Sequence, residues 1–277
     1  MKNFVIYIIT FFCISLITIS VNASSDLDIL LSNDDGYDAP GIKALAEALT
    51  SIAMVTVAAP ANQQSGAGHG ITYREPIFVR QVNNQYHIPW YAITARPATC
   101  VHLGLENLLK TKPDLVITGI NKGENIGPVT FRSGTVGAAR EAAILGLPAI
   151  AISLQGDDKD DYKAAALYIR QLVEKLASKK LLHSKLLLNV NFPSGVSKKI
   201  KGTKVTKLSL VDEKNTYQKI NFPFLEIYKS GKIKLVLDND PQTDVNAFSN
   251  GYVTITPLSL DQSDYAELDS LKGLNKD

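Results

Sequence analysis

The chain has 277 residues, of which 45% are hydrophobic and 20% are charged, and its formal net charge is +2. This composition is typical of a folded globular protein rather than a disordered one. The small net charge gives no electrostatic basis for binding nucleic acid or a membrane surface, so we expect neither partner. The length suits one large α/β domain or two small ones.

The first 23 residues are predicted to be a secretory signal peptide. Lys2 precedes an almost wholly apolar run over 4–21, and Val21 and Ala23 occupy positions −3 and −1 of a cleavage site. An uncleaved membrane anchor is the alternative, because the apolar run approaches the length that spans a bilayer. The polar residues after Ala23 favour cleavage. We therefore expect residues 24–277 to form one exported domain, periplasmic or secreted, without stable membrane association.

Cleavage of the signal peptide would leave a single cysteine, Cys100. The mature chain therefore has no intrachain disulfide. A domain of this size can bury enough apolar surface without one. We expect Cys100 to be a small buried residue rather than a nucleophile.

Apolar runs of strand length alternate with helical segments in the first two-thirds of the chain. Pro40 stands at the favoured first position of one helix, and Gly146 ends another. This alternation predicts an α/β fold with a mainly parallel sheet covered by helices on both faces. The predicted strands are 28–32, 54–59, 113–119, 148–154 and 186–191, and the predicted helices are 40–49, 133–145 and 160–178.

The last third of the chain is rich in predicted strands. A β-hairpin is predicted around Ser230 and Gly231, and a further strand at 252–257. The two strands of this hairpin would be 224–229 and 232–237. We interpret the region from about 202 to 258 as an arm or subdomain, of a kind that often serves in contacts between subunits.

Three polar segments follow predicted strands, at 33–36, 60–68 and 119–127. Ligands of open parallel sheets bind outside the carboxyl ends of the strands, so these segments should converge on one crevice. Neighbouring carboxylates such as Asp34 and Asp35 stay together when both are solvated or when a cation lies between them. Carboxylate, hydroxyl and amide oxygens suit Mg²⁺, Mn²⁺ or Ca²⁺. The alternative is a plain turn that caps a helix.

A fourth segment, 133–140, opens a predicted helix with Ser133, Gly134 and Thr135. Free backbone N–H groups and hydroxyls at a helix start form an anion site. The alternative is an ordinary N-cap with close helix packing. Beside a metal site, phosphate binding is the better interpretation. The four histidines are scattered and show no spacing typical of zinc ligands.

Six segments, in order from about residue 28 to 258, resemble the SurE family of metal-dependent 5′/3′-nucleotidases. They are LLSNDDGYDAPGI, APANQQSGAGHGIT, DLVITGINKGENIG, SGTVGAAREAAILGLPAIAISL, LLLNVNFP and TDVNAFSNGYVTITPL. The resemblance implies a Rossmann-like three-layer sandwich with a β-hairpin arm exchanged between the subunits of a homodimer or homotetramer. It also implies hydrolysis of nucleoside 5′- or 3′-monophosphates, with polyphosphate as a further substrate of some members.

The resemblance further implies which residues form the site. Asp34, Asp35 and Asn121 would be catalytic, and with Ser65 they would hold one divalent ion per subunit. That ion would be Mg²⁺ or Mn²⁺, with Ca²⁺ as a possible substitute in a crystal. Either aspartate would orient the attacking water. Contacts to the phosphate and the rest of the substrate would come from Asn62, Asn125, Ser133, Gly134 and Thr135.

The chain departs from the family pattern at 95–101, where Ala-Arg-Pro-Ala-Thr-Cys-Val replaces the common Gly-Thr-Pro-Ala-Asp-Cys-Val. A carboxylate is lost and Arg96 is gained, which leaves the nucleotide preference open. Arg96 is either a contact for a second phosphate or a solvated charge, and Lys122 is either an active-site cation or a solvated lysine. The alternative functions are a broad-specificity or polyphosphate-hydrolysing phosphatase and a non-catalytic nucleotide-binding protein.

Overall fold

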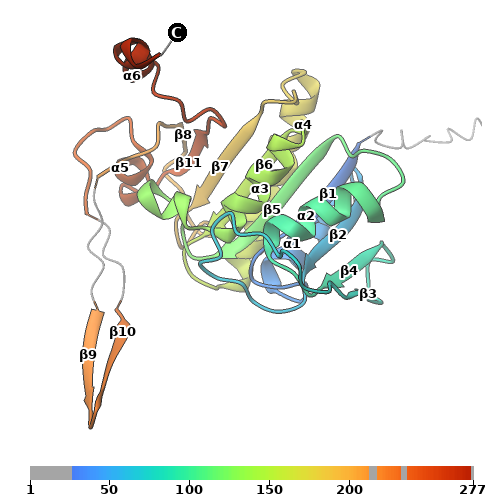
Figure 1. Ribbon diagram of the computed structural model, residues 1–277. Coiled ribbons are helices and arrows are strands. Elements are labelled where there is room, and N and C mark those ends of the chain that lie inside the picture. The colour runs from blue at the N-terminus through green and yellow to red at the C-terminus, as the bar shows by residue number, and fades with distance from the viewer. Residues whose placement is uncertain (1–26, 212–216, 232–235, 276–277) are drawn as a thin grey trace, which may run out of the picture.

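The computed structural model describes residues 27–211, 217–231 and 236–275 (Figure 1). Within them, a nine-stranded sheet has the order β3-β4-β2-β1-β5-β6-β7-β11-β8. The strands from β4 to β7 run parallel, and β3 and β11 pair antiparallel with their neighbours β4 and β7. The bounds are β1 Asp28–Ser32, β2 Met54–Pro60, β3 Val79–Gln81, β4 Trp90–Ile93, β5 Leu115–Lys122, β6 Ala149–Leu154, β7 Leu187–Phe192, β8 Thr203–Val205 and β11 Val253–Pro257.

Helices cover both faces of this sheet and so create two hydrophobic cores. One core joins the sheet to α1 (Pro40–Leu49) and α4 (Lys159–Ser178). The other joins it to α2 (Pro97–Leu103) and α3 (Gly134–Ile144). The remaining helical segments are η1 Gly104–Leu108, η2 Gly127–Phe131, α5 Asp244–Ser249, α6 Tyr265–Ser270 and η3 Leu271–Leu274. The predicted α/β class with a three-layer arrangement is confirmed.

The predicted strands and helices of the α/β core are also confirmed, with bounds that differ by a few residues. Helix α1 shows why: Pro40 starts it, and Ile42, Leu45 and Leu49 lie on one buried face. Strand β5 runs further than predicted, to Lys122, because a register shift against β6 after Thr118 lets pairing resume at Asn121. A polar segment that looked like a loop therefore lies partly within the sheet.

The predicted position of the hairpin is wrong. The observed strands are β9 (Tyr217–Phe222) and β10 (Leu225–Ser230), joined by a tight turn at Pro223 and Phe224. Pro223 cannot donate to a ladder and favours a turn, whereas the prediction placed the turn at Ser230 and Gly231. The second predicted strand, 232–237, lies mostly outside the described residues, and its last two residues are not in a strand.

The arm is also smaller than the predicted region 202–258. Strands β8 and β11, which stand near the two ends of that region, pair with each other and belong to the main sheet. Only β9 and β10 form a separate two-stranded sheet, and this hairpin projects away from the body of the molecule (Figure 1). The prediction failed because a single short strand carries no signal of the sheet that it joins.

The predicted signal peptide, 1–23, lies outside the described residues. Among the residues that the structure describes, no helix combines the length and the apolar character needed to cross a bilayer. The predicted burial of Cys100 is confirmed. Burial raises the pKa of its thiol well above the ordinary value, which makes the thiolate scarce.

Candidate active site

The candidate site lies where the strand order of the sheet reverses direction. The chain passes from β1 to β2 on one side of β1 and later returns to β5 on the other side. The carboxyl ends of β1 and β5 therefore open onto a topological switch point, the usual ligand position in such sheets. Asp34 and Asp35 follow β1, and Asn121 lies near the end of β5. The structure thus brings together the first and third segments of the predicted convergence, 33–36 and 119–127.

The carboxylate of Asp34 is buried at the start of α3. Its Oδ1 accepts the hydroxyl of Thr135, and the residue is only 3% exposed. The pKa of Asp34 is raised to about 6, because burial and then the neighbouring Asp35 charge raise it by more than the bond from Thr135 lowers it. A Cβ at Gly134 would lie 2.9 Å from Oδ2 of Asp34, so only glycine leaves room for this carboxylate.

Asp35 ties together three of the predicted segments. Its Oδ2 accepts the backbone N–H of Lys122 at 2.8 Å. Burial raises the pKa of Asp35, while bonds from Lys122 and the Gln63 side chain oppose the rise. Gln63 Nε2 also donates to Ser65 Oγ at 3.0 Å, so a single amide connects Asp35 to the predicted serine ligand. Gln63 was missed by the sequence analysis, although its place two residues before Ser65 is a usable signal.

Asn121 directly precedes Lys122, whose backbone bonds to Asp35. Its Nδ2 donates to the carbonyl of Gly123 at 2.7 Å, which fixes the orientation of the amide. Within the described residues Oδ1 has no hydrogen-bond donor, so it remains available as a ligand. No group of three or more His, Cys, Asp or Glu side chains in the described part of the chain is arranged to hold a metal. A metal here must therefore combine the Asp34–Asp35 pair with amide and hydroxyl oxygens, a donor set that fits Mg²⁺ or Mn²⁺.

The start of α3 differs from the prediction in the roles of its residues. Ser133 is the N-cap, and its Oγ accepts the N–H of Val136 at 3.2 Å. Its hydroxyl hydrogen has no acceptor among the described residues, so it can donate to a ligand. The hydroxyl of Thr135 is instead directed to Asp34, and Thr135 is fully buried. Thr135 and Gly134 therefore position the carboxylate of Asp34. Of the three residues predicted to contact phosphate at this helix start, Ser133 alone keeps a side-chain donor for it.

Asn125 and Asn62, the other two predicted substrate contacts, lie in different surroundings. Asn125 is 5% exposed, and its Nδ2 donates to Ser153 Oγ at 2.8 Å. Its backbone N–H donates to Asn191 and its carbonyl accepts from Asn189, so this residue holds the loop after β5. This placement does not support the predicted substrate contact. Asn62 is exposed and lines a polar cavity beside the site.

The ammonium group of Lys122 is paired with a residue outside the carboxylate pair, although its charge still lowers the pKa of Asp35. Its Nζ forms an ion pair with Asp157 at 2.6 Å, and both side chains are largely exposed. This pair raises the pKa of Lys122 and lowers the pKa of Asp157. The structure favours the solvated lysine of the two readings made from the sequence.

The loop that carries Ser65 is fastened to both helices on its face of the sheet. Glu141 of α3 contacts His69 of the loop and His102 of α2, each across 2.7 Å. The bond from His69 and then that from His102 lower the pKa of Glu141. The sequence offers no signal for this cluster, because its members are far apart in the chain and only the fold brings them together.

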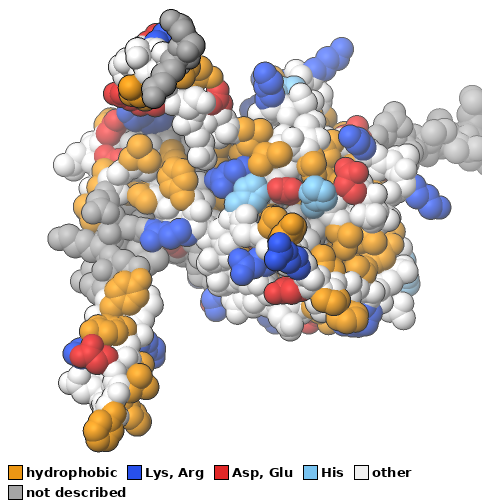
Figure 2. Space-filling view, viewed as in Figure 1, with side chains coloured by type: hydrophobic (Ala, Val, Ile, Leu, Met, Phe, Trp, Pro, Cys, Tyr) orange, Lys and Arg blue, Asp and Glu red, His pale blue; other side chains and the backbone are white. Residues whose placement is uncertain are grey.

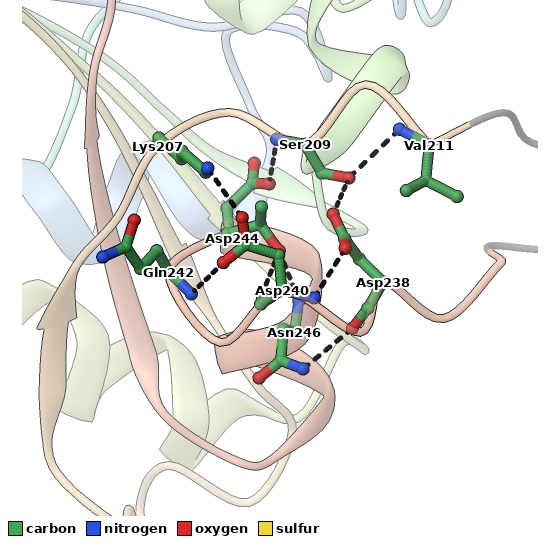
Figure 3. Close-up of polar contacts among 9 residues, drawn as sticks. Lys207, Ser209, Val211, Asp238, Asp240, Gln242, Asp244 and Asn246 are labelled. Carbon is green, nitrogen blue, oxygen red and sulfur yellow. Dashed lines mark hydrogen bonds and ion pairs between the residues drawn. The ribbon is translucent and has the colours of Figure 1, made fainter.

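A second polar cluster lies at the base of the arm, where Asp244, Ser209 and Asp238 are linked (Figure 3), and Asp244 also bonds the loop after β5. Asp244 is fully buried, and its carboxylate accepts the backbone N–H groups of Gly127 and Ser209, both at 2.9 Å. Burial raises the pKa of Asp244 and these bonds oppose the rise. Beside it, the N–H of Lys207 donates to the carbonyl of Gln242 at 3.0 Å, which closes the base of the arm.

Fold and site together define a Rossmann-like α/β protein with a buried carboxylate pair at its switch point. The family model described as "Survival protein SurE" matches residues 29–215. Proteins named 5′-nucleotidase SurE from Legionella pneumophila strains Lens, Corby and Paris are each 42% identical over 249 residues, covering 90% of this chain and 97% of each relative. The crystal structure of the SurE protein from Aquifex aeolicus is 38% identical with a TM-score of 0.78, over 90% of this chain and 100% of that one. The chain belongs to the SurE family.

Proposed function

We propose that the mature chain is a divalent-metal-dependent phosphomonoesterase that hydrolyses nucleoside 5′- or 3′-monophosphates to nucleoside and phosphate. The observation that carries this proposal is the buried Asp34 carboxylate, which is held beside Asp35 at the switch point by the hydroxyl of Thr135. Two carboxylates in this position are stabilised by a cation. The name 5′-nucleotidase carried by the Legionella relatives supports a nucleotide substrate.

The residues of the site have separate roles in this proposal. Asp34 and Asp35 hold one Mg²⁺ or Mn²⁺ ion with Ser65 and Asn121, and one of the two carboxylates orients the attacking water. When bound, the ion supplies positive charge to the phosphoryl oxygens and acidifies water. The hydroxyl of Ser133 and the N-terminal end of α3 bind the phosphate oxygens.

The arm and the N-terminus extend the proposal to assembly and location. The hairpin exposes a series of large apolar side chains along both strands (Figure 2). They are Tyr217, Ile220, Phe222, Phe224, Leu225, Ile227 and Tyr228. An isolated hairpin is marginally stable and an exposed apolar patch marks an interaction site, which supports exchange of the arm within a homodimer or homotetramer. The predicted signal peptide at 1–23 supports export to the periplasm or the medium.

The first test is phosphate release from a panel of nucleoside 5′- and 3′-monophosphates. The metal-stripped mature protein is resupplied with Mg²⁺ or Mn²⁺ and compared with Asp34→Asn. We expect metal-dependent release, and a loss of about 100-fold or more in kcat/KM for the variant, because a ligand and a charge are removed. Asp38→Asn is the matched control, since Asp38 is exposed and pairs with Lys43. Folded protein that binds nucleotides but releases no phosphate with any metal would contradict the proposal and favour a binding protein.

A further inference from the structure

A polar cavity of about 270 Å³ adjoins the candidate site at the carboxyl end of β4. Its lining residues include the polar Asn62 and Gln64 and the oppositely charged Glu75 and Arg96. The backbone N–H of Gln64 donates to the carbonyl of Asp34 at 2.7 Å, so the cavity and the carboxylate pair share one wall. A ligand whose phosphate lies at the carboxylate pair can therefore extend into this cavity.

Arg96 is held in place at the edge of the cavity. Its backbone N–H donates to Thr72 Oγ1 at 2.9 Å, and the N–H of Thr72 donates to Thr99 Oγ1 at 2.8 Å. A Cβ at Gly70 would lie 2.3 Å from Nη1 of Arg96, so the guanidinium lies directly against this glycine. Thr72 thus joins the loop to Arg96 and Thr99, two of the three positions at which 95–101 departs from the family pattern.

The two charged residues that line the cavity are not paired with each other or with another described residue. Neither Arg96 nor Glu75 forms an ion pair with another residue of the described ranges. The cavity therefore offers a planar fork of donors and a carboxylate acceptor to the same ligand. A second phosphate would face the Glu75 carboxylate, and like charges repel at this range. A neutral group with acceptors on one edge and donors on another can bond to the guanidinium of Arg96 and to the carboxylate of Glu75 at once.

We propose that this cavity binds the base of the nucleotide and prefers guanine; the proposal rests on the proposed function. The O6 and N7 atoms of guanine are two acceptors that match the guanidinium of Arg96 in the bidentate geometry. The N1–H and amino groups are donors that match the carboxylate of Glu75. Adenine has an amino group in place of O6, so it meets Arg96 donor to donor. Arg96 and Glu75 are thus specificity-determining residues of this chain.

The test compares kcat/KM for GMP and AMP in the wild-type protein, Arg96→Lys and Glu75→Gln. We expect GMP to be preferred by about tenfold, and each variant to reduce that ratio by a similar factor. Lysine keeps the charge of Arg96 but lacks the planar pair of N–H donors. A fall in the GMP/AMP ratio of kcat/KM in this variant would therefore indicate bidentate recognition. Arg74→Gln is the control for loss of a nearby cation, because Arg74 lies over the ring of Tyr73 and does not line the cavity.

Guanosine supplies a readout that does not depend on turnover. It should inhibit competitively and bind in calorimetry more tightly than adenosine, and Arg96→Lys should remove the difference. Equal use of GMP and AMP, or a ratio unchanged in both variants, would overturn the inference and leave the nucleotidase proposal intact. An effect of Arg96 confined to nucleoside bisphosphates, without guanosine binding, would also overturn it. Absence of nucleotide hydrolysis with guanosine still bound would sink the proposed function instead.

Discussion

Individual side chains at the site are oriented by partners that lie on other elements. The hydroxyl of Thr135 on α3 fixes Asp34, and the backbone of β5 and the amide of Gln63 fix Asp35. Each contact holds an oxygen in a defined direction before any ligand arrives. Such preorganisation is what makes a small set of oxygens selective for one geometry of bound ion.

Glu141 is the residue that fastens the Ser65 loop, and its substitution tests that role. We expect Glu141→Gln to lower the free energy of unfolding by about 1–2 kcal/mol, because bonds from His69 and His102 lose their charged acceptor. The folded-state pKa of Glu141 is lowered, so its contribution is full above the ordinary value of 4.5 and is lost as the pH falls through the folded pKa. Urea unfolding at pH 7 and at pH 3.5 measures both effects.

The control for Glu141→Gln is Glu106→Gln, on an exposed glutamate of η1. We expect that control to stay within about 0.5 kcal/mol of the wild type. A variant of Glu141 that is as stable as the wild type at pH 7 and keeps the full acid dependence would show that the cluster does not hold the loop.

At the scale of elements, the hairpin of β9 and β10 stands apart from the nine-stranded sheet of the described residues. Every residue of both strands is exposed. The two strands pair only with each other, over six residues each, so they gain little stability from the rest of this chain. The arm exchange proposed above would supply the hairpin with the packing surface that it lacks in the described part of the chain.

Substitution of Phe222 by aspartate should weaken self-association, because it places a charge in the apolar patch of the arm. We expect the apparent mass in light scattering to shift toward the monomer, with the dissociation constant raised by about tenfold or more. Gln218→Asp, which adds the same charge to an exposed polar position of β9, is the control. A wild-type chain that is already monomeric, or a Phe222→Asp variant that assembles normally, would contradict arm exchange.

At the scale of the whole molecule, the C-terminal segment is part of the structure that supports the site. Strand β11 is the neighbour of β7 in the main sheet, and Asp244 bonds the backbone of Gly127 in the loop after β5. The two hydrophobic cores lie on opposite faces of the same strands. A change near the C-terminal end of the chain is therefore transmitted to the loop that also carries Asn125.

Asp244→Asn tests this connection. We expect a loss of about 2–4 kcal/mol in the free energy of unfolding, because an amide N–H would replace one buried acceptor and face the N–H of Gly127 or Ser209. We also expect kcat/KM toward nucleotides to fall. Asp240→Asn is the control, because Asp240 pairs with Lys207 at the surface and should cost less than about 1 kcal/mol. Equal effects of the two substitutions in urea unfolding would argue against a supporting role.

Much of the core could be predicted because its signals are local. Apolar runs such as Leu115–Ile117 indicate buried strands, and Pro40 indicates the start of a helix. Carboxylates that follow a strand indicate its carboxyl end. The pair Asp34–Asp35 was found for that reason, whereas Asn121 was identified through the resemblance to the SurE family. The alternation of predicted strands and helices favours a parallel sheet. In such a sheet, the strand order decides where the switch point lies, and it places Asp34 there.

Other features could not be predicted because they depend on which distant residues meet. The hydroxyl of Thr135 looks the same in the sequence whether it faces phosphate or Asp34. Asn125 looks like a loop ligand until Asn189 and Asn191 are placed beneath it by β7. The contact of Glu141 with His69 likewise requires the packing of the loop on α3.

The closed base of the arm has a consequence for how such proteins diversify. The chain leaves the main body after Lys207 and returns at Gln242, and these two residues are hydrogen-bonded neighbours. An arm of another length or sequence can be joined between the same two points without altering the spacing of β8 and α5. If the arm mediates assembly as proposed, quaternary organisation and the candidate active site are encoded in separable stretches of one gene, so either can drift or be recombined while the other is kept.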